Sequence, residues 1–126
     1  MEAFKSTNLF EFKERFKTTN DCYQYLIDLK WGKGFRCSRC NCKTAVRSKT
    51  WYYRRCKECQ YDESATSGTL FHKLKFPLIK AFYILFRLSI SKKGISSVQI
   101  GKEFGIQQKT AYLFKRKVHI SMRESG

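Results

Sequence analysis

The stretch that decides the fold reads Cys37-Ser38-Arg39-Cys40 and then, after fifteen further residues, Cys56-Lys57-Glu58-Cys59. Each Cys-x-x-Cys pair is predicted to form a tight turn whose backbone N–H groups point at the sulfurs. Two such turns offer a tetrahedron of thiolates at ~2.3 Å from one ion, and this closed shell leaves no position for water. The spacing therefore predicts one structural Zn²⁺, without catalytic chemistry, bound by Cys37, Cys40, Cys56 and Cys59.

Other interpretations of the cysteines stay open at this point. Iron accepts the same four-thiolate shell, and four free thiols are the simplest alternative. Cys42 lies only two residues after Cys40, a spacing that suits the turn poorly, although its thiol could compete for the metal. Cys22 lies on the apolar face of a predicted helix and is expected in the core. His72 and His119 are expected at the surface rather than in the metal site.

The chain is strongly basic for its size. Its 126 residues include 26 Lys and Arg against 10 Asp and Glu, which gives a formal net charge of +16. Four thiolates and one Zn²⁺ would lower this charge only to about +14. A polyanion is the natural partner of such a surface, and nucleic acid is the first candidate. A membrane surface, or a basic protein without such a partner, is the alternative.

The apolar segments favour a cytoplasmic protein that does not enter a membrane. Met1–Phe16 mixes charged with apolar side chains and lacks the apolar core of a signal peptide. Phe76–Ile90 is the most apolar stretch, but it is shorter than the ~18 residues of a membrane span and contains Lys80 and Arg87. Cysteines stay reduced in the cytoplasm, so metal binding is favoured over disulfides.

The segments around the cysteine pairs predict helices on both sides of an extended ribbon. Candidate caps at Ser6, Thr7 and Asn8 and at Thr19–Asp21 precede two N-terminal helices. Between and after the pairs, Lys43–Arg55 is predicted to be extended and Glu63–Phe71 to form a hairpin-like strand. Three further helices are predicted over Phe76–Ser91, Ser96–Phe104 and Gln107–Met122.

The last two of these helices fit a helix-turn-helix. Gly105 supplies the positive φ of the tight turn, and Gly101 is small enough for close helix approach. Ala111, Phe114 and Val118 recur at the spacing of a buried stripe. The opposite side is rich in groups that pair with base edges or phosphates. The residues predicted to contact nucleic acid are Gln107, Gln108, Lys109, Thr110, Tyr112, Lys115, Arg116 and His119. An ordinary helical hairpin with a solvated basic face is the alternative.

Together these elements predict a small α+β fold. A four-cysteine zinc ribbon, residues 35–75, is flanked by an N-terminal helical segment, residues 1–34, and by a C-terminal helix-turn-helix bundle, residues 76–126. The two Cys-x-x-Cys pairs are the only internal repeat.

The order of these motifs resembles the N-terminal region of bacterial insertion-sequence transposases. The matching stretches are Trp31–Cys40, Tyr53–Cys59, Ser67–Phe71, Ile95–Ile100 and Gly105–Ala111. In that family a helical segment, a zinc ribbon and a helix-turn-helix precede a DDE-type nuclease. Two departures are Ser38 and Asn41, where the family often has Pro and Gly, and Asn tolerates the left-handed conformation that the turn requires.

The resemblance implies a chain that binds DNA but is not an enzyme. The sequence stops at Gly126, where the family's nuclease would begin, so we expect the end-binding part without the cutting part. The implied partner is double-stranded DNA at a mobile element's ends, with a full-length transposase or a second copy as further possible partners. An RNA- or ribosome-binding zinc ribbon, or a basic adaptor for an acidic protein, is the alternative function.

Overall fold

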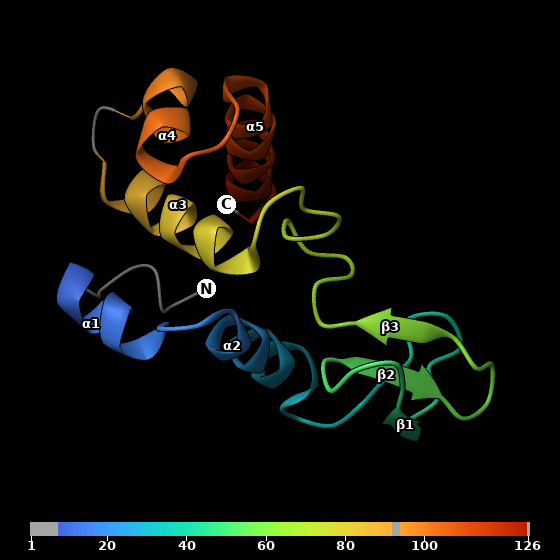
Figure 1. Cartoon of the computed structure of the whole chain (residues 1–126). Coiled ribbons are helices and arrows are strands. Elements are labelled where there is room, and N and C mark those ends of the chain that lie inside the picture. Colours follow the sequence, from blue (N-terminus) through green and yellow to red (C-terminus); the bar gives the residue numbers. More distant parts are fainter. Residues whose placement is uncertain (1–7, 92–93, 126) are drawn as a thin grey trace. The chain divides into compact units, whose positions relative to one another are not determined.

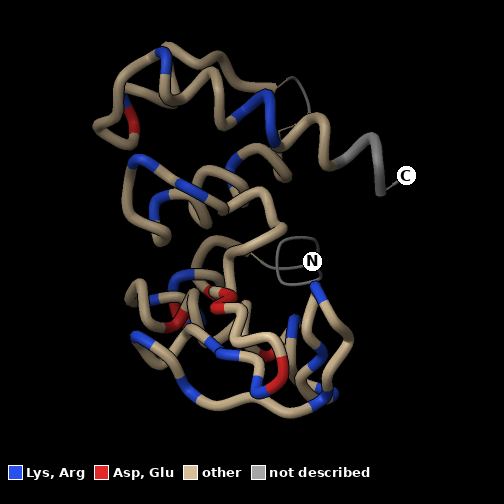
Figure 2. The backbone as a smooth tube through the Cα atoms, turned by 90° about the vertical axis from the view of Figure 1, so that its right-hand side faces the viewer, with Lys and Arg blue, Asp and Glu red and all other residues tan. Residues whose placement is uncertain are grey.

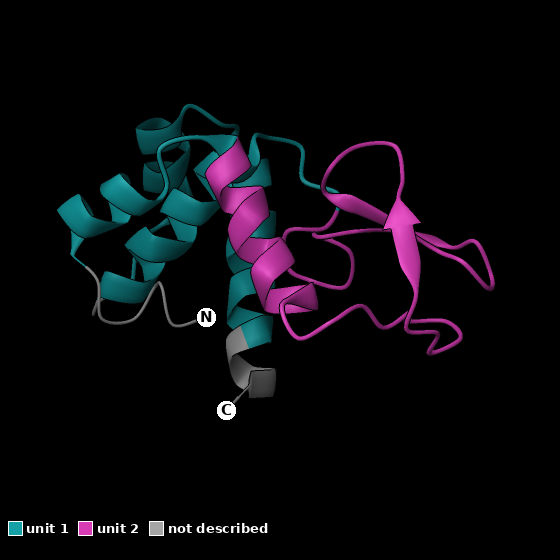
Figure 3. Ribbon diagram, turned by 90° about the horizontal axis from the view of Figure 1, so that it is seen from below, with its two compact units in different colours: residues 1–19, 73–126 teal, residues 20–72 magenta. Residues whose placement is uncertain are grey.

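A computed structural model describes residues 8–91 and 94–125, and the side chains of these ranges up to Ser121. The chain divides into two compact units, residues 20–72 and residues 1–19 with 73–126 (Figure 3). One contains a small antiparallel sheet with the cysteine pairs, and the other is helical (Figure 1). This confirms the predicted α+β class, whereas the three-domain division with boundaries after residues 34 and 75 stays a prediction.

The ribbon unit consists of one helix and a three-stranded sheet. Helix α2 spans Thr19–Trp31, and the strands are β1 (Ala45–Arg47), β2 (Tyr53–Cys56) and β3 (Asp62–Ser64). The sheet is antiparallel in the order β1-β2-β3, with Arg55 opposite Val46 on one side and opposite Asp62 on the other. This order places the second cysteine pair directly at the end of the central strand.

Helix α2 buries the face that its sequence period predicts. Cys22, Leu26 and Ile27 are buried, and the ring of Tyr23 stacks on Tyr52 at 3.9 Å between centroids. Burial, together with the nearby Asp21 carboxylate, raises the pKa of the Cys22 thiol to about 12. The expectation that Cys22 belongs to the core is confirmed.

The helical unit has an aromatic core between its first two helices. Helix α1 spans Leu9–Arg15 and α3 spans Leu78–Ile90. Phe12 stacks on Phe86 at 4.5 Å, and the Tyr83 hydroxyl donates to the Phe16 carbonyl at 2.9 Å. Asn8 caps α1 by accepting from the backbone N–H of Glu11 at 2.9 Å. The other two candidate caps, Ser6 and Thr7, lie outside the described residues.

Two further helices complete this unit, α4 (Ser97–Phe104) and α5 (Gln108–Ser125). Gly105 ends α4 with φ 66°, as the turn was predicted to require. A Cβ added at Gly101 would lie 2.8 Å from the Ile106 carbonyl oxygen, so only glycine allows this approach. The predicted stripe of Ala111, Phe114 and Val118 is buried. The local geometry of the α4–turn–α5 segment therefore agrees with the sequence pattern.

The strand predicted over Glu63–Phe71 is wrong beyond Ser64. Turns follow, in which the backbone N–H groups of Ser67, Thr69 and His72 each donate to the carbonyl three residues earlier. The hydroxyls of this segment bond locally as well, for example Ser64 with Thr66 and Ser67 at 3.0 Å. Such side-chain bonds compete with a strand ladder, which explains the difference.

Two smaller corrections concern the residues at which β2 and α3 begin. The backbone N–H of Tyr53 donates to the Thr50 carbonyl, so the segment before Tyr53 turns rather than extending β2. Helix α3 begins at Leu78, because Pro77 is the cap residue and not part of the first turn. Within the described residues, no helix has the length and apolar character needed to cross a membrane.

Candidate metal centre and nucleic-acid surface

The two cysteine turns have the same backbone structure. In the first turn the N–H of Asn41 donates to the Cys37 carbonyl at 3.0 Å, and in the second the N–H of Gln60 donates to the Cys56 carbonyl at 3.0 Å. Asn41 and Gln60 close these turns in the left-handed region, with φ 64° and 61°. The prediction for Asn41 is thereby confirmed, whereas Gln60 gave no sequence indication of this conformation.

Each turn also directs a backbone N–H at its first sulfur. The N–H of Arg39 lies 3.4 Å from Sγ of Cys37, and the N–H of Glu58 lies 3.4 Å from Sγ of Cys56. Hydrogen bonds of this kind stabilise the charged thiolate over the thiol. Each turn therefore stabilises the thiolate form of its first cysteine.

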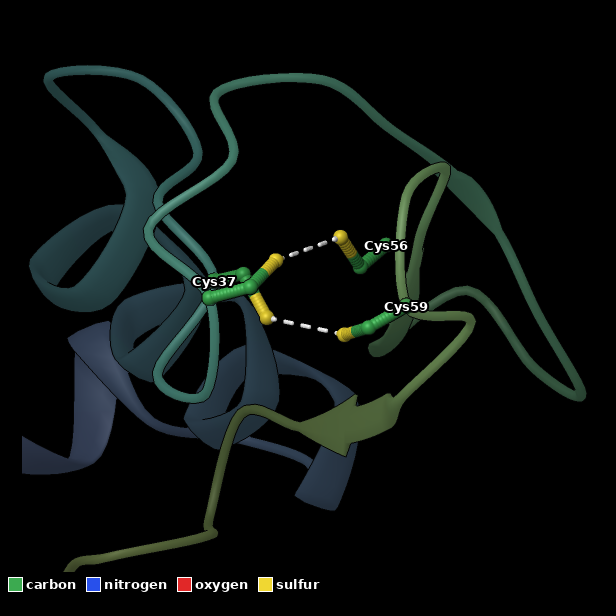
Figure 4. A group of neighbouring side chains, drawn as sticks. Cys37, Cys56 and Cys59 are labelled. Atoms are coloured by element: carbon green, nitrogen blue, oxygen red, sulfur yellow. Dashed lines mark hydrogen bonds between the residues drawn. The ribbon is translucent and has the colours of Figure 1, made fainter.

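The four sulfurs form one cluster. Their Sγ atoms all lie within 4.8 Å of one another, and Cys37, Cys56 and Cys59 point toward a common centre (Figure 4). Sγ of Cys37 lies 3.6 Å from Sγ of Cys59, and Sγ of Cys40 lies 3.5 Å from Sγ of Cys56. Thiolates at ~2.3 Å from a tetrahedral zinc ion have sulfur–sulfur edges of about 3.8 Å. The cluster is therefore consistent with one structural zinc ion.

The pKa values at the cluster reflect four sulfurs that compete for protons. The backbone N–H of Cys40 lowers the pKa of the Cys37 thiol to about 7, against the opposing effect of burial. Burial raises the pKa of the Cys56 thiol. Zinc, when bound, supplies the positive charge that keeps all four cysteines deprotonated.

Cys42 has a different role from the four clustered cysteines. Its carbonyl accepts from the N–H of Cys37 at 2.9 Å, as the Tyr61 carbonyl accepts from the N–H of Cys56 at 3.1 Å in the second turn. Its sulfur lies 3.2 Å from the Thr44 hydroxyl. Cys42 thus closes the first turn through its backbone, and the cluster found among the described residues does not include its sulfur.

A half-buried ion pair contacts the first cysteine turn. Nζ of Lys30 on α2 lies 2.7 Å from a carboxylate oxygen of Glu63 on β3, and it donates to the carbonyls of Ser64 and Ser67. The Ser38 hydroxyl, inside the first Cys-x-x-Cys pair, donates to the same carboxylate at 2.9 Å. Sequence reasoning did not find this network, because Lys30 and Glu63 are far apart in the chain and belong to no motif.

Two surface contacts stiffen the ribbon further. The Arg39 guanidinium lies 4.2 Å from the centre of the Tyr61 ring, which joins the two cysteine turns by a cation–π contact. Asp62 accepts two hydrogen bonds from Arg55 and one from Ser48. The Arg55 guanidinium and then the Ser48 hydroxyl lower the pKa of the Asp62 carboxyl to about 2.

The residues predicted to contact nucleic acid lie at the surface of the helical unit. Gln107 precedes α5, and the others lie on it. All are exposed except Thr110 and Lys115, which are half-buried. A groove of about 470 Å³ is lined by Ser97 at the start of α4 and by Tyr112, Lys115, Arg116, His119 and Ile120. His72 is exposed as well, and neither histidine belongs to the cysteine cluster among the described residues.

Basic side chains are spread over both units. Figure 2 shows many Lys and Arg positions along the backbone of each, with few Asp and Glu between them. Two acidic residues of the sheet already have partners, since Glu63 pairs with Lys30 and Asp62 with Arg55. The excess positive charge is therefore left to face solvent or a polyanion.

Comparison with protein families identifies a known zinc-ribbon domain in the chain. Residues 17–62 match the family model described as the transposase zinc-ribbon domain, of the IS1595 type. The matched range contains α2, β1, β2, the first residue of β3 and the four clustered cysteines. Neither characterised proteins nor solved structures gave a match.

Proposed function

We propose that this chain is the DNA-binding part of an insertion-sequence transposase and recognises the ends of the mobile element. The observation that carries the proposal is the match of residues 17–62 to a transposase zinc ribbon, together with a four-sulfur cluster of the right shape. A zinc ribbon of this type suggests nucleic acid as the partner. The helical unit would supply most of the surface that contacts this nucleic acid.

The α4–turn–α5 segment is the proposed reading element. In a helix-turn-helix the second helix enters the major groove and presents side chains near its N-terminus to base edges. Gln108 and Tyr112 lie in the first turns of α5 and are exposed, with Arg116 one turn further on. Gln pairs bidentately with adenine and Arg with guanine, so this face has the chemistry for direct readout.

Phosphate contacts would come from the groove between α4 and α5. Lys115 and His119 line it beside Ser97, whose backbone lies at the N-terminal end of α4. Positive side chains at a helix N-terminus favour a phosphate group. These contacts would position α5 on the duplex without reading its sequence.

The proposed role of the metal is structural. Cys37, Cys40, Cys56 and Cys59 would hold one Zn²⁺, and the two cysteine turns would thereby keep the ribbon's basic surface rigid. The ribbon would extend the contact with DNA beyond the α4–α5 segment. Partners within the transposition reaction would be the duplex and a full-length transposase.

Selection from a randomised duplex library, followed by binding measurements at several salt concentrations, tests the proposal. We expect one enriched motif, a specific affinity at least ~10³-fold above random duplex, and a salt slope equivalent to several phosphate contacts. Absence of an enriched motif would contradict sequence-specific recognition. Tighter binding to structured RNA than to the selected duplex would instead favour an RNA-binding zinc ribbon.

A further inference from the structure

Helix α5 has a second stripe beside the proposed DNA contacts, and this stripe carries exposed apolar side chains. Leu113 and Ile120 are seven residues apart on one side of the helix, and their side chains are 43% and 46% exposed. Thr110 and Lys117 lie on the same side. Exposed leucine and isoleucine do not bind phosphate, and where they line a groove they offer an apolar surface to a partner.

The stripe forms one wall of a groove within the helical unit. The segment Lys73–Phe76 supplies the opposite wall, and the groove has a volume of about 360 Å³. Leu74, Phe76, Leu113, Phe114 and Ile120 make its surface mainly apolar. The groove is large enough for one or two apolar side chains of a partner.

The rim of this groove is cationic. Lys73, Lys75, Arg116 and Lys117 line it, and of the residues that the structure describes no Asp or Glu does. An apolar floor within a ring of positive charge is complementary to a peptide that combines apolar anchors with carboxylates. Nucleic acid would match the rim but leave the apolar floor without a partner.

The groove and the proposed DNA-reading face point in different directions. Successive residues of an α-helix are about 100° apart around its axis, so Leu113 is turned by that angle from Tyr112, and Ile120 from His119. A partner in the groove therefore leaves Gln108, Tyr112 and His119 accessible. Arg116 and Ile120 line both grooves, and Thr110 lines this groove while also being a predicted DNA contact.

We propose that this groove, the α5 groove, docks an acidic amphipathic segment of another protein. One or two Leu- or Phe-sized side chains enter between Lys73–Phe76 and α5, and the flanking carboxylates contact the cationic rim. A second copy of this chain is the less favoured occupant, because a formal net charge of +16 on each copy opposes close approach. The proposal does not depend on the proposed DNA function.

Fluorescence anisotropy with the zinc-loaded full chain tests the α5 groove. The probe is a designed, fluorescein-labelled peptide of about 15 residues, which corresponds to about four helical turns. It carries Leu and Phe at helical spacing among Glu and Asp. A control peptide carries Ser in place of Leu and Phe at the same net charge. We expect the probe to bind on the order of tenfold more tightly than the control peptide, since each buried anchor contributes to the affinity.

The double variant Leu74→Ser/Leu113→Ser should lose this preference and keep its affinity for duplex DNA, because both residues line this groove and neither lines the groove proposed for phosphate. Val98→Ser on α4 is the matched control, because Val98 is 44% exposed but lies outside the groove. Zinc content and circular dichroism show whether each variant is folded. Equal binding of both peptides, or an unchanged preference in the double variant, would overturn the proposal. The same holds if the chain self-associates through this groove and thereby excludes the probe.

Displacement of the probe provides a second readout. A short duplex that binds the DNA-reading face should leave the probe in place, apart from a modest effect through shared charge. Complete, stoichiometric displacement by duplex would mean that the groove belongs to the DNA site, and would overturn the assignment to a protein partner.

Discussion

Lys30 and the buried Glu63 form an ion pair that joins α2 to the cysteine ribbon, with 2.7 Å between the ammonium nitrogen and a carboxylate oxygen. Through Ser38, the same carboxylate contacts the first Cys-x-x-Cys turn. A pair of this kind specifies which surfaces meet, because each charge is costly without its partner. The rigidity of the first turn therefore depends on α2 as well as on the metal.

Replacing Glu63 should destabilise the ribbon. Glu63→Gln leaves the half-buried Lys30 ammonium without its counter-charge, and loss of a charged hydrogen-bond partner typically costs about 1–3 kcal/mol. Glu14→Gln is the matched control, since Glu14 pairs with Lys17 at an exposed site where such pairs contribute about 0–1 kcal/mol. Urea unfolding of the zinc-bound protein measures both. Equal stability of the two variants would show that the Lys30–Glu63 pair is not a structural link.

Arg116→Ala should weaken binding to the selected duplex and leave the metal content unchanged. Loss of a bidentate contact to guanine costs about 1–3 kcal/mol, and the preference at one base position should relax. Lys13→Ala, at an exposed position of α1, removes the same charge as a control. If both variants bind alike, the reading surface lies elsewhere.

Gly101→Ala should disrupt the α4–α5 segment despite being a small change. The added Cβ would meet the Ile106 carbonyl oxygen at 2.8 Å, and overpacking of this kind costs about 1–3 kcal/mol. Lys102→Ala, at the exposed neighbouring position, controls for the change in helix sequence. Amide exchange in α4 and α5 reports the effect. Protection equal to that of the original protein would mean that the two elements do not approach as described.

The six cysteines should differ in their reaction with an alkylating reagent. Cys42 is half-buried and outside the cluster, so it should react first in the zinc-loaded protein. The metal protects the four clustered thiolates until a chelator removes it. Cys22 should react only on unfolding, because burial excludes the reagent and raises the pKa of its thiol to about 12. Early modification of Cys22 in the folded, zinc-loaded chain would contradict its place in the core.

The features that sequence reasoning could predict are those set by local chemistry. The Cys-x-x-Cys spacing was enough to predict the sulfur cluster, and Asn41 and Gly105 occupy left-handed turns as their residue types suggest. The helical period of Ala111, Phe114 and Val118 correctly predicted a buried stripe. The turns and the stripe depend on residues close together in the sequence, whereas the cluster joins two distant pairs whose shared affinity for one metal ion makes their meeting predictable.

The features that sequence reasoning could not predict depend on contacts between distant segments or on competing local hydrogen bonds. Lys30 and Glu63 are 33 positions apart in the numbering, and neither residue type predicts the other. The segment after Ser64 looked like a strand from Thr69 and Phe71, but its hydroxyls bond to nearby groups and turn the chain. The α5 groove was missed for a similar reason, since its two walls come from separate segments.

Metal stoichiometry, measured by native mass spectrometry together with elemental analysis, tests the central claim most directly. We expect one Zn²⁺ per chain in the original protein and in Cys42→Ser, and loss of the metal with unfolding of the ribbon in Cys37→Ser and Cys59→Ser. The loss should be severe, because structural zinc contributes roughly 10–16 kcal/mol in small zinc-binding peptides. Iron in place of zinc, retention of metal by Cys37→Ser, or loss of metal in Cys42→Ser would contradict a zinc ribbon held by Cys37, Cys40, Cys56 and Cys59.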